Sequence, residues 1–283
     1  MTMIEKTKGN NKKFWQAINK IVGKHKNNAV KVLINSDNNG SITNDKKVIA
    51  EIFNKKFNEI GNTHTSLDNK INNYSISQQF YNRGINLKFE FKEVTNNHIV
   101  SIINTLKNKI SGNNDIRIRE IELIIDIILK PLTNEINKSI SNGIYPTSLK
   151  QIKIIPVYKS GSKFLPENYR PISMTTNFAK IVDTVAYNQL NDYINSNDLI
   201  SDNQFGFKRN HSCILQVIKL KDKLIDNLEK NNISIAIFID IKQAFPSLNH
   251  DIMMQKLKSL GCERIVIKWF KDYLTKMEHY VYK

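Results

Sequence analysis

The sequence predicts an α/β fold, of the helix-rich α+β kind, and three observations indicate it. Apolar residues recur at three- and four-residue spacing over long stretches such as 178–196, as in amphipathic helices. Residues 152–158 form a short β-favouring run that ends in a polar loop. In residues 233–239 six of seven are apolar, and Asp240 follows. This last run predicts a strand that is buried on both faces.

The N-terminal part of the chain is predicted to be a basic, mainly helical spacer, residues 1–88, and the remainder, residues 89–283, a second domain. A length of 283 residues suits one large or two ordinary domains. The spacer is expected to begin with a basic amphipathic helix at 1–30 and a hairpin at 30–40. A helix at 43–60, which ends at Gly61, and a polar linker at 61–88 are expected to follow.

The second part alternates helical and strand patterns. Pro156 interrupts the strand at 152–158 and predicts an edge or bulged position for it. The apolar segment 121–129 is well short of the roughly 18 residues that span a bilayer, and we expect it to be a buried helix. Helices are expected at 95–107, on both sides of Pro131 up to Gly143, and at 178–196, 212–230, 253–260 and 265–274.

The charge of the chain favours a phosphate-rich partner. A net charge of +16 and a pI near 9.6 attract nucleic acid through long-range steering and counterion release. An AT-rich coding sequence would also give a chain rich in Asn, Lys and Ile, so charge alone leaves both explanations open. Cys213 and Cys262 form no short-spaced pair, which fits a reducing compartment, and the N-terminus lacks the apolar core of a signal peptide.

Asp240 is the residue on which a functional interpretation depends. A carboxylate at the end of a buried strand is costly unless a cation or several hydrogen-bond donors lie beside it. Asp240 is therefore either an acceptor for backbone N–H groups or a metal ligand, and its spacing alone leaves the two readings even.

Four ordered motifs carry a resemblance that covers nearly the whole chain. They are Lys159-Ser-Gly161, Asn168-Tyr-Arg-Pro-Ile-Ser173, Gln204-Phe-Gly-Phe207 and Phe238-Ile-Asp-Ile-Lys-Gln-Ala-Phe245. In this order they resemble the reverse transcriptase of non-LTR (LINE-type, jockey-like) retrotransposons. The resemblance implies the fingers and part of the palm of a right-hand polymerase, preceded by a helical spacer.

The same resemblance implies RNA-directed DNA synthesis by two-metal nucleotidyl transfer. The implied partners are an RNA template, a DNA primer and dNTPs, with Mg²⁺ or Mn²⁺ as the cofactor, no membrane, and a nuclear or cytoplasmic location. Asp240 matches the first metal-binding aspartate, and the backbone carbonyl of Ile241 would be the neighbouring ligand. Phe245 matches the aromatic residue that stacks under the incoming sugar and excludes a 2′-hydroxyl.

The other candidate residues would bind the nucleotide and the nucleic acid. Lys159 and Arg170 match the residues that hold the incoming triphosphate, and their charges suit phosphate. The residues Gln204, Gly206 and Phe207 resemble a loop that lines the template and nucleotide pocket, and Lys208 and Arg209 are candidate nucleic-acid contacts. Taken singly, the basic residues would more often be solvated surface, Phe245 core packing and Gly206 an ordinary turn.

Departures from the family pattern limit what the chain is expected to do. Pro246 stands where the family usually has Asp. Asn210 stands in place of a small-glycine pattern, and Cys213 in place of a threonine. The loop Gly112-Asn-Asn-Asp-Ile116 lacks its second glycine. The sequence contains no Asp-Asp pair. We therefore expect a fragment that does not polymerise alone, with an aggregation-prone strand at 233–241. The alternatives are a non-catalytic nucleic-acid-binding remnant and a degenerate fragment without function.

Overall fold

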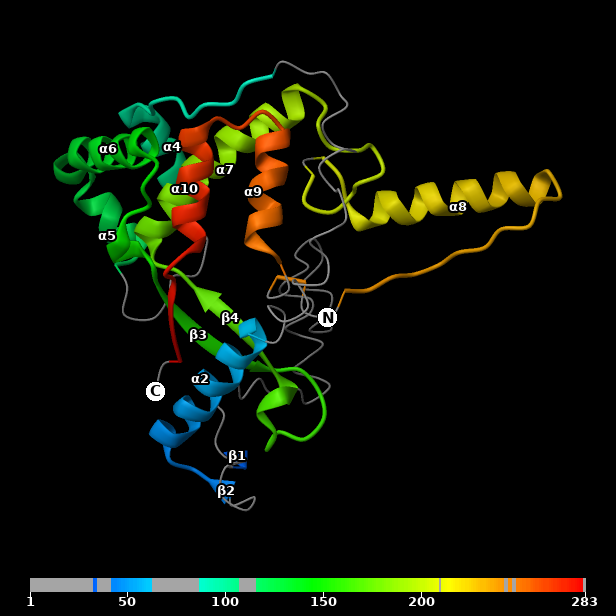
Figure 1. The fold of residues 1–283 in the computed structure, drawn as a ribbon, viewed down its shortest axis with the longest axis horizontal. Coiled ribbons are helices and arrows are strands. Elements are labelled where there is room, and N and C mark those ends of the chain that lie inside the picture. Colours follow the sequence, from blue (N-terminus) through cyan, green and yellow to red (C-terminus); the bar gives the residue numbers. More distant parts are fainter. Residues whose placement is uncertain are drawn as a thin grey trace, which may run out of the picture. The chain divides into compact units, whose positions relative to one another are not determined.

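A computed structural model describes residues 33–34, 42–62, 87–106, 116–208, 210–241, 244–245 and 248–281 (Figure 1). The chain divides into two compact units. The first draws on residues 1–56, 154–172 and 281–283, and the second on residues 57–153 and 173–280. Helices with a small sheet make up the described part, so the predicted helix-rich α+β class is confirmed. The predicted domain division at residue 88 stays a prediction.

A short hairpin and helix α2 (Lys46–Asn62) form the N-terminal elements of the described chain. Strands β1 (Leu33–Ile34) and β2 (Ile42–Thr43) pair antiparallel, as the turn-rich sequence between them predicts. The side chain of Asp45 accepts a hydrogen bond from the Lys47 N–H at 2.7 Å, so α2 begins slightly later than expected.

The larger sheet has the strand order β4-β3-β5, with β3 (Gln151–Tyr158) in the centre between β4 (Tyr169–Met174) and β5 (Glu278–Val281). The edge or bulge position expected from Pro156 is therefore wrong. A proline is tolerated in this central strand because β5 is only four residues long. Strand β5 begins where the Glu278 N–H donates to the Lys150 carbonyl at 3.0 Å, and Pro156 lies six residues beyond Lys150.

The second unit is built around packed helices whose apolar faces follow the predicted periodicity. The helices are α4 (Asn96–Leu106), α5 (Ile118–Leu123), α6 (Ile125–Asn142), α7 (Asn177–Ser196), α8 (Cys213–Glu229), α9 (His250–Ser259) and α10 (Arg264–Leu274). Helices α4, α5, α6, α7 and α10 share a core that holds Ile99, Ile103, Ile121, Ile136, Ile140, Ile181, Val185 and Trp269, whereas α8 has no buried residue. The helices expected at 95–107, 178–196, 212–230, 253–260 and 265–274 are confirmed within a few residues.

The break between α5 and α6 lies at Ile124, and the expected break at Pro131 is wrong. Pro131 sits inside α6, where it removes the hydrogen bond to the carbonyl of Ile127. Ile127 is exposed, so water can satisfy that carbonyl. Leu123 is exposed as well, so the segment 121–129, which was expected to be a buried helix, is buried only in part. Gly143 ends α6 at φ 64°, the left-handed conformation that favours glycine.

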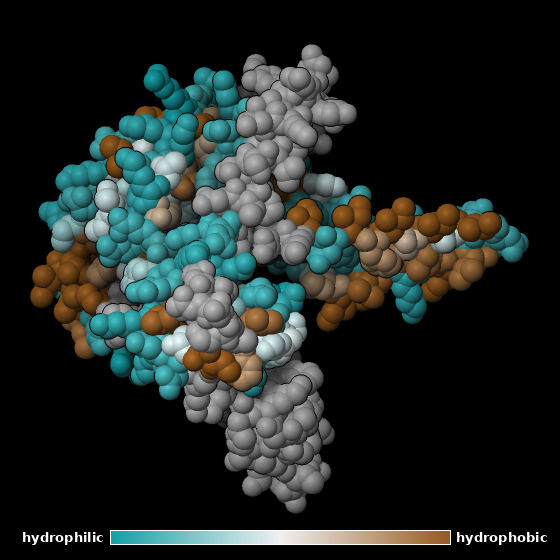
Figure 2. All heavy atoms as spheres, turned by 60° about the horizontal axis from the view of Figure 1, so that its bottom comes forward, coloured by the Kyte–Doolittle hydropathy of each residue, from teal (hydrophilic) through white to brown (hydrophobic). Residues whose placement is uncertain are grey.

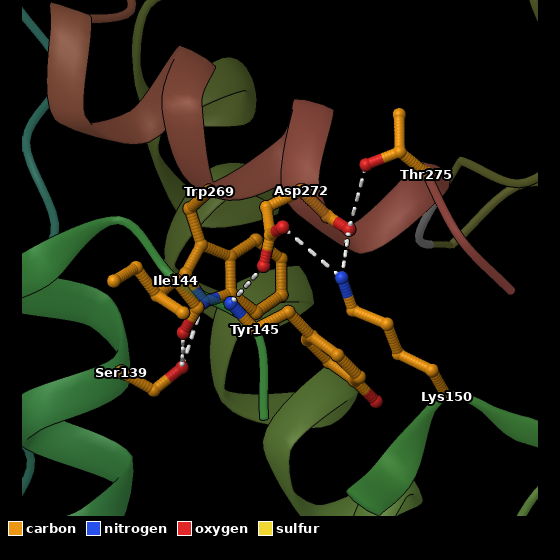
Figure 3. A network of polar contacts seen from close by, with 7 residues as sticks. All are labelled: Ser139, Ile144, Tyr145, Lys150, Trp269, Asp272 and Thr275. Carbon is orange, nitrogen blue, oxygen red and sulfur yellow. Dashed lines mark hydrogen bonds and ion pairs between the residues drawn. The ribbon is translucent and has the colours of Figure 1, made fainter. Parts of the chain in front are cut away.

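A buried ion pair joins α10 to the start of β3 (Figure 3). The Lys150 Nζ lies 3.1 Å from the Asp272 Oδ1 and donates to the Asp272 carbonyl at 2.6 Å. The Lys150 side chain is only 5% exposed, against 33% for Asp272. An ammonium taken out of water needs such partners, because its desolvation is otherwise uncompensated.

The same α10 residues also fix the turn after α6. The Trp269 indole N–H donates to the Ser139 hydroxyl at 3.0 Å, and Ser139 donates to the Ile144 carbonyl at 2.7 Å. The second Asp272 oxygen accepts the Tyr145 N–H at 2.8 Å. These bonds satisfy backbone groups that the end of α6 leaves without helical partners. Side chains more than 120 residues apart in sequence thus complete one network.

The expected buried strand at 233–241 does not form. These residues have no regular secondary structure, and Ile235, Ile237 and Ile239 are each more than 80% exposed. A strand needs neighbouring strands to pair its N–H and C=O groups, and no described strand pairs with this segment. Helix α8, which precedes this segment, also has no buried residue. The apolar side chains of the helix and of the segment are exposed (Figure 2). The aggregation expected from this surface stays a prediction.

Two expectations fall on parts of the chain that the structure does not describe. They concern the basic helix at 1–30 and most of the linker at 61–88. Among the described helices, none combines the length and apolar content needed to cross a bilayer.

The Lys150–Asp272 pair gives the first testable prediction. Asp272→Ala removes the carboxylate that balances the buried Lys150 ammonium, which keeps only the main-chain carbonyl, and it leaves the Tyr145 N–H without its acceptor. It should lower the free energy of unfolding by about 2–4 kcal/mol. The double variant Lys150→Met/Asp272→Ala should recover part of that loss, because no unpaired charge remains. Denaturant titration measures both variants.

The matched control is the exposed pair of Lys138 and Glu135, whose atoms are 2.7 Å apart. Glu135→Gln should cost less than about 1 kcal/mol, because water already screens both charges. An equal loss in Asp272→Ala and Glu135→Gln would contradict the assignment of the buried pair as a determinant of stability.

Candidate active site

Lys159 and Arg170 lie in one β-hairpin of the first unit. Lys159 directly follows β3, Arg170 is the second residue of β4, and both are exposed. The Lys159 N–H donates to the Asn168 carbonyl at 2.8 Å, which closes the hairpin. The structure therefore places these two cations, which are eleven positions apart in sequence, in the same hairpin.

The loop between the two strands is fixed by its own polar groups. The Asn168 side-chain amide donates to the Ser162 carbonyl at 2.8 Å, and the Tyr158 hydroxyl donates to the Gly161 carbonyl at 2.6 Å. Gly161 has φ 87°, and a Cβ there would meet the Asn168 side chain at 2.7 Å. Gly161 is thus required both for its backbone conformation and for the close approach of Asn168.

Aromatic packing holds the hairpin against α2 within the first unit. Tyr169, beside Arg170, is buried, and its ring lies edge-on to Phe53 with centroids 5.1 Å apart. The Tyr169 hydroxyl donates to the Lys163 carbonyl at 2.8 Å. The sequence reading missed this support for Arg170. No alternation in β4 signals this support, because residues 170–173 are all exposed after the buried Tyr169.

Gln204, Gly206 and Phe207 share an exposed loop between α7 and α8. The Gln204 side-chain amide lies 3.4 Å from the Gly206 carbonyl, and Phe207 is 93% exposed at φ 59°. A Cβ on Gly206 would meet nothing within 4 Å, so the described protein leaves that backbone open. Lys208 is half-buried beside this loop, and Arg209 lies outside the described residues.

Asp240, Ile241 and Phe245 lie in the exposed segment that follows α8. Asp240 is exposed, Ile241 is 67% exposed and Phe245 is 83% exposed. The premise that Asp240 is a costly buried carboxylate is therefore wrong for this structure. A solvated Asp240 needs neither a cation nor several donors beside it. The argument for a metal from the cost of burying this carboxylate therefore does not hold.

The described residues contain no group of three or more Asp, Glu, His or Cys side chains that could hold a metal ion. Magnesium binds through several oxygen ligands in near-octahedral geometry, and two-metal chemistry needs a shared set of carboxylates. Asp240 and the Ile241 carbonyl do not make such a set by themselves. The described part of the chain thus does not fit a complete two-metal site.

The most perturbed carboxyl group is Asp183 on α7, which the sequence reading did not single out. Burial raises the pKa of Asp183 to about 6, and a hydrogen bond from the Tyr145 hydroxyl at 3.0 Å partly opposes this shift. Burial together with the Asp183 charge also raises the pKa of Tyr145, and burial raises that of Tyr273 to about 12. Because these tyrosines belong to the helical core, Asp183 is a core polar group and not a site residue.

The C-terminal part of the chain is similar to a known protein family. Residues 157–283 match the family model described as "Reverse transcriptase (RNA-dependent DNA polymerase)". This region contains all four motifs that carry the resemblance, and the match confirms the resemblance to reverse transcriptases.

Curated relatives come from mobile elements of fruit flies. The chain is 33% identical over 117 residues to the "Probable RNA-directed DNA polymerase from transposon BS" of Drosophila melanogaster, which covers 41% of the chain and 13% of the relative. It is 28% identical to the "RNA-directed DNA polymerase from mobile element jockey" of Drosophila melanogaster over 160 residues (56% of the chain, 18% of the relative) and of Drosophila funebris over 169 residues (59% and 18%). The chain thus spans less than a fifth of the length of these relatives.

Asp183 generates a pH prediction. Its folded pKa near 6 lies above the ordinary value of 3.8, so the group favours the folded state most below pH 4. The free energy of unfolding should fall between about pH 4 and 6, by up to about 3 kcal/mol, and this contribution should stay level above pH 6. Asp183→Asn keeps an acceptor for Tyr145 and should flatten that fall, as measured by denaturant titration at pH 4 and pH 7.

The matched control is Asp222→Asn, which changes an exposed carboxyl on α8. It should keep the pH dependence of the unaltered protein. A pH dependence that survives in Asp183→Asn, or disappears in Asp222→Asn, would overturn the assignment.

Proposed function

Taking the reverse transcriptase family as the premise, we propose that this chain supplies the fingers and the first part of the palm of a retrotransposon polymerase. The full-length protein would make DNA from dNTPs on an RNA template with a DNA primer. The observation that carries the proposal is the order of the four motifs, with Lys159 and Arg170 presented by one hairpin inside the matched region.

Lys159 and Arg170 are proposed to bind the triphosphate of the incoming nucleotide. The guanidinium of Arg170 offers a planar pair of donors to phosphate oxygens, whereas Lys159 supplies a compact charge. The hairpin bonds around Asn168 and the packing of Tyr169 hold both backbones before a ligand arrives, which lowers the entropic cost of binding.

Asp240 and the Ile241 carbonyl are proposed as ligands of a divalent metal, Mg²⁺ or Mn²⁺, and Phe245 as the residue under the incoming sugar. The support is the family resemblance at residues 238–245. Since one carboxylate does not complete a two-metal site, further ligands are required from outside the described residues. Gln204, Gly206, Phe207, Lys208 and Arg209 are proposed to face the template and the nucleotide.

A non-catalytic nucleic-acid-binding role is the second candidate. The net charge of +16 and the exposed position of Asp240 favour it, because charge alone attracts phosphate backbones. This role requires salt-sensitive binding to RNA or primer–template that depends on neither Mg²⁺ nor Asp240. The enzymatic role requires both.

The hairpin cations can be tested by nucleotide binding. Lys159→Ala and Arg170→Ala should each weaken the affinity for a fluorescent dNTP by about 10-fold or more, because each removes a charge-assisted contact to phosphate. Lys163→Ala is the matched control in the same loop. Its Nζ lies 5.6 Å from the centre of the Tyr158 ring, and its loss should leave the affinity within about 2-fold. Equal affinity in all three variants would refute the triphosphate assignment.

The role of Asp240 can be tested in a protein that joins residues 1–283 to the downstream polymerase segment of the jockey relative. This protein should incorporate dNTPs on a primed RNA template, and Asp240→Ala should reduce incorporation to background because it removes a metal ligand. Asp251→Ala, a nearby exposed carboxyl on α9, is the control and should retain activity. Full activity in Asp240→Ala would exclude a catalytic role for that residue.

A further inference from the structure

A hollow of about 450 Å³ lies between α7 and the loop before α8, all within the second unit. Its lining consists of Tyr187, Asn188, Asn191, Asp192, Phe207 and Lys208. The volume falls in the range of small-molecule and nucleotide-sized sites. Of these residues, only Phe207 belongs to a motif that carries the family resemblance, and Lys208 directly follows it.

Two aromatic rings line the hollow and face water. Phe207 is 93% exposed and Tyr187 is 59% exposed. Phe207 has φ 59°, a backbone conformation that bulky residues rarely adopt and that the surrounding structure must hold. Exposed rings held in this way gain nothing from core packing. They are, however, the surface on which a flat heterocycle stacks.

The polar lining favours a base over a phosphate group. Asn188 and Asn191 carry side-chain amides that can donate and accept, as the edges of nucleobases require. Asp192 brings a negative charge into the hollow. The one lysine that lines it, Lys208, lies with its Nζ 3.3 Å from the Asp202 Oδ1, so its charge is already matched. A triphosphate would meet an unfavourable field here, whereas an uncharged base would not.

The loop that carries Phe207 is anchored to α8. The Lys219 Nζ donates to the Asn203 Oδ1 at 2.9 Å and lies 5.6 Å from the centre of the Phe205 ring. The Gln204 N–H donates to the Ser201 carbonyl at 3.0 Å. Between these anchors, Gly206 leaves its Cβ position open. A flat ligand can therefore approach the backbone beside Phe207 without displacing a side chain of the described protein.

We propose that this hollow binds an unpaired base of single-stranded nucleic acid, stacked on Phe207 and Tyr187 and contacted at its edge by Asn188 and Asn191. The inference rests on the proposed function, since the strand's phosphates must be attracted by the basic chain. It adds α7, through Tyr187, to the surface that contacts nucleic acid.

The test compares two fluorescent 12-nucleotide DNA strands of equal charge, one with bases and one fully abasic. The intact chain should bind the strand with bases at least about 10-fold more tightly. Tyr187→Leu and Phe207→Asn should each weaken that binding by about 10-fold and leave the abasic strand unaffected. Asn suits the left-handed backbone at position 207, so Phe207→Asn removes the ring without new strain.

Tyr280→Leu, a half-exposed aromatic residue on β5, is the matched control and should bind both strands as the unaltered chain does. Equal affinity for the two strands, or an equal loss on both strands in the ring variants, would overturn the base site while leaving nucleic-acid binding intact. No binding to either strand would overturn the proposed function together with the base site.

Discussion

The buried ammonium of Lys150 is the constraint on which the second unit depends. Its desolvation is offset only because Asp272 offers both a carboxylate and a main-chain carbonyl at the end of α10. The same carboxylate holds the Tyr145 N–H, and one turn earlier Trp269 reaches Ser139. Helices α6 and α10 and the start of β3 therefore share a fixed geometry. Apolar packing alone would let these helices slide, whereas paired polar groups specify one arrangement.

A second, separate set of contacts orders the hairpin of Lys159 and Arg170. It consists of short-range hydrogen bonds around Asn168 and of aromatic packing between Tyr169 and Phe53. The hairpin thus has its own support within the first unit. In β4 the buried Tyr169 packs against Phe53 while the adjacent Arg170 is exposed, so one short strand both packs and presents charge. Phe53 lies within residues 1–88, the predicted spacer, and its ring packs against Tyr169 beside Arg170.

Features that depend on local interactions could be predicted from the sequence, whereas features that depend on contacts between distant residues could not. Periodicity located α4, α7, α8, α9 and α10, because a helix satisfies its own backbone groups locally. Pro131 misled the reading, since the exposure of Ile127 depends on packing that no local pattern encodes. The pairs of Lys150 with Asp272 and Tyr145 with Asp183 join distant segments, and only the structure reveals them. Among the candidate site residues, the sequence predicted neither the hairpin that carries Lys159 and Arg170 nor the exposure of Asp240, because both depend on which strands pair.

The contrast between Lys159 and Asp240 has one physical cause. The hairpin of Lys159 and Arg170 closes through contacts between residues close in sequence, so its geometry is complete within the first unit. The segment before Asp240 is apolar and β-favouring, and it can be ordered only by strands that pair with it. No described strand does so, and Ile235, Ile237 and Ile239 stay in water. Any partner that pairs with residues 233–241 would bury these side chains and, at the same time, fix the direction of the Asp240 carboxylate. Strand pairing and metal-site assembly would then be one coupled event.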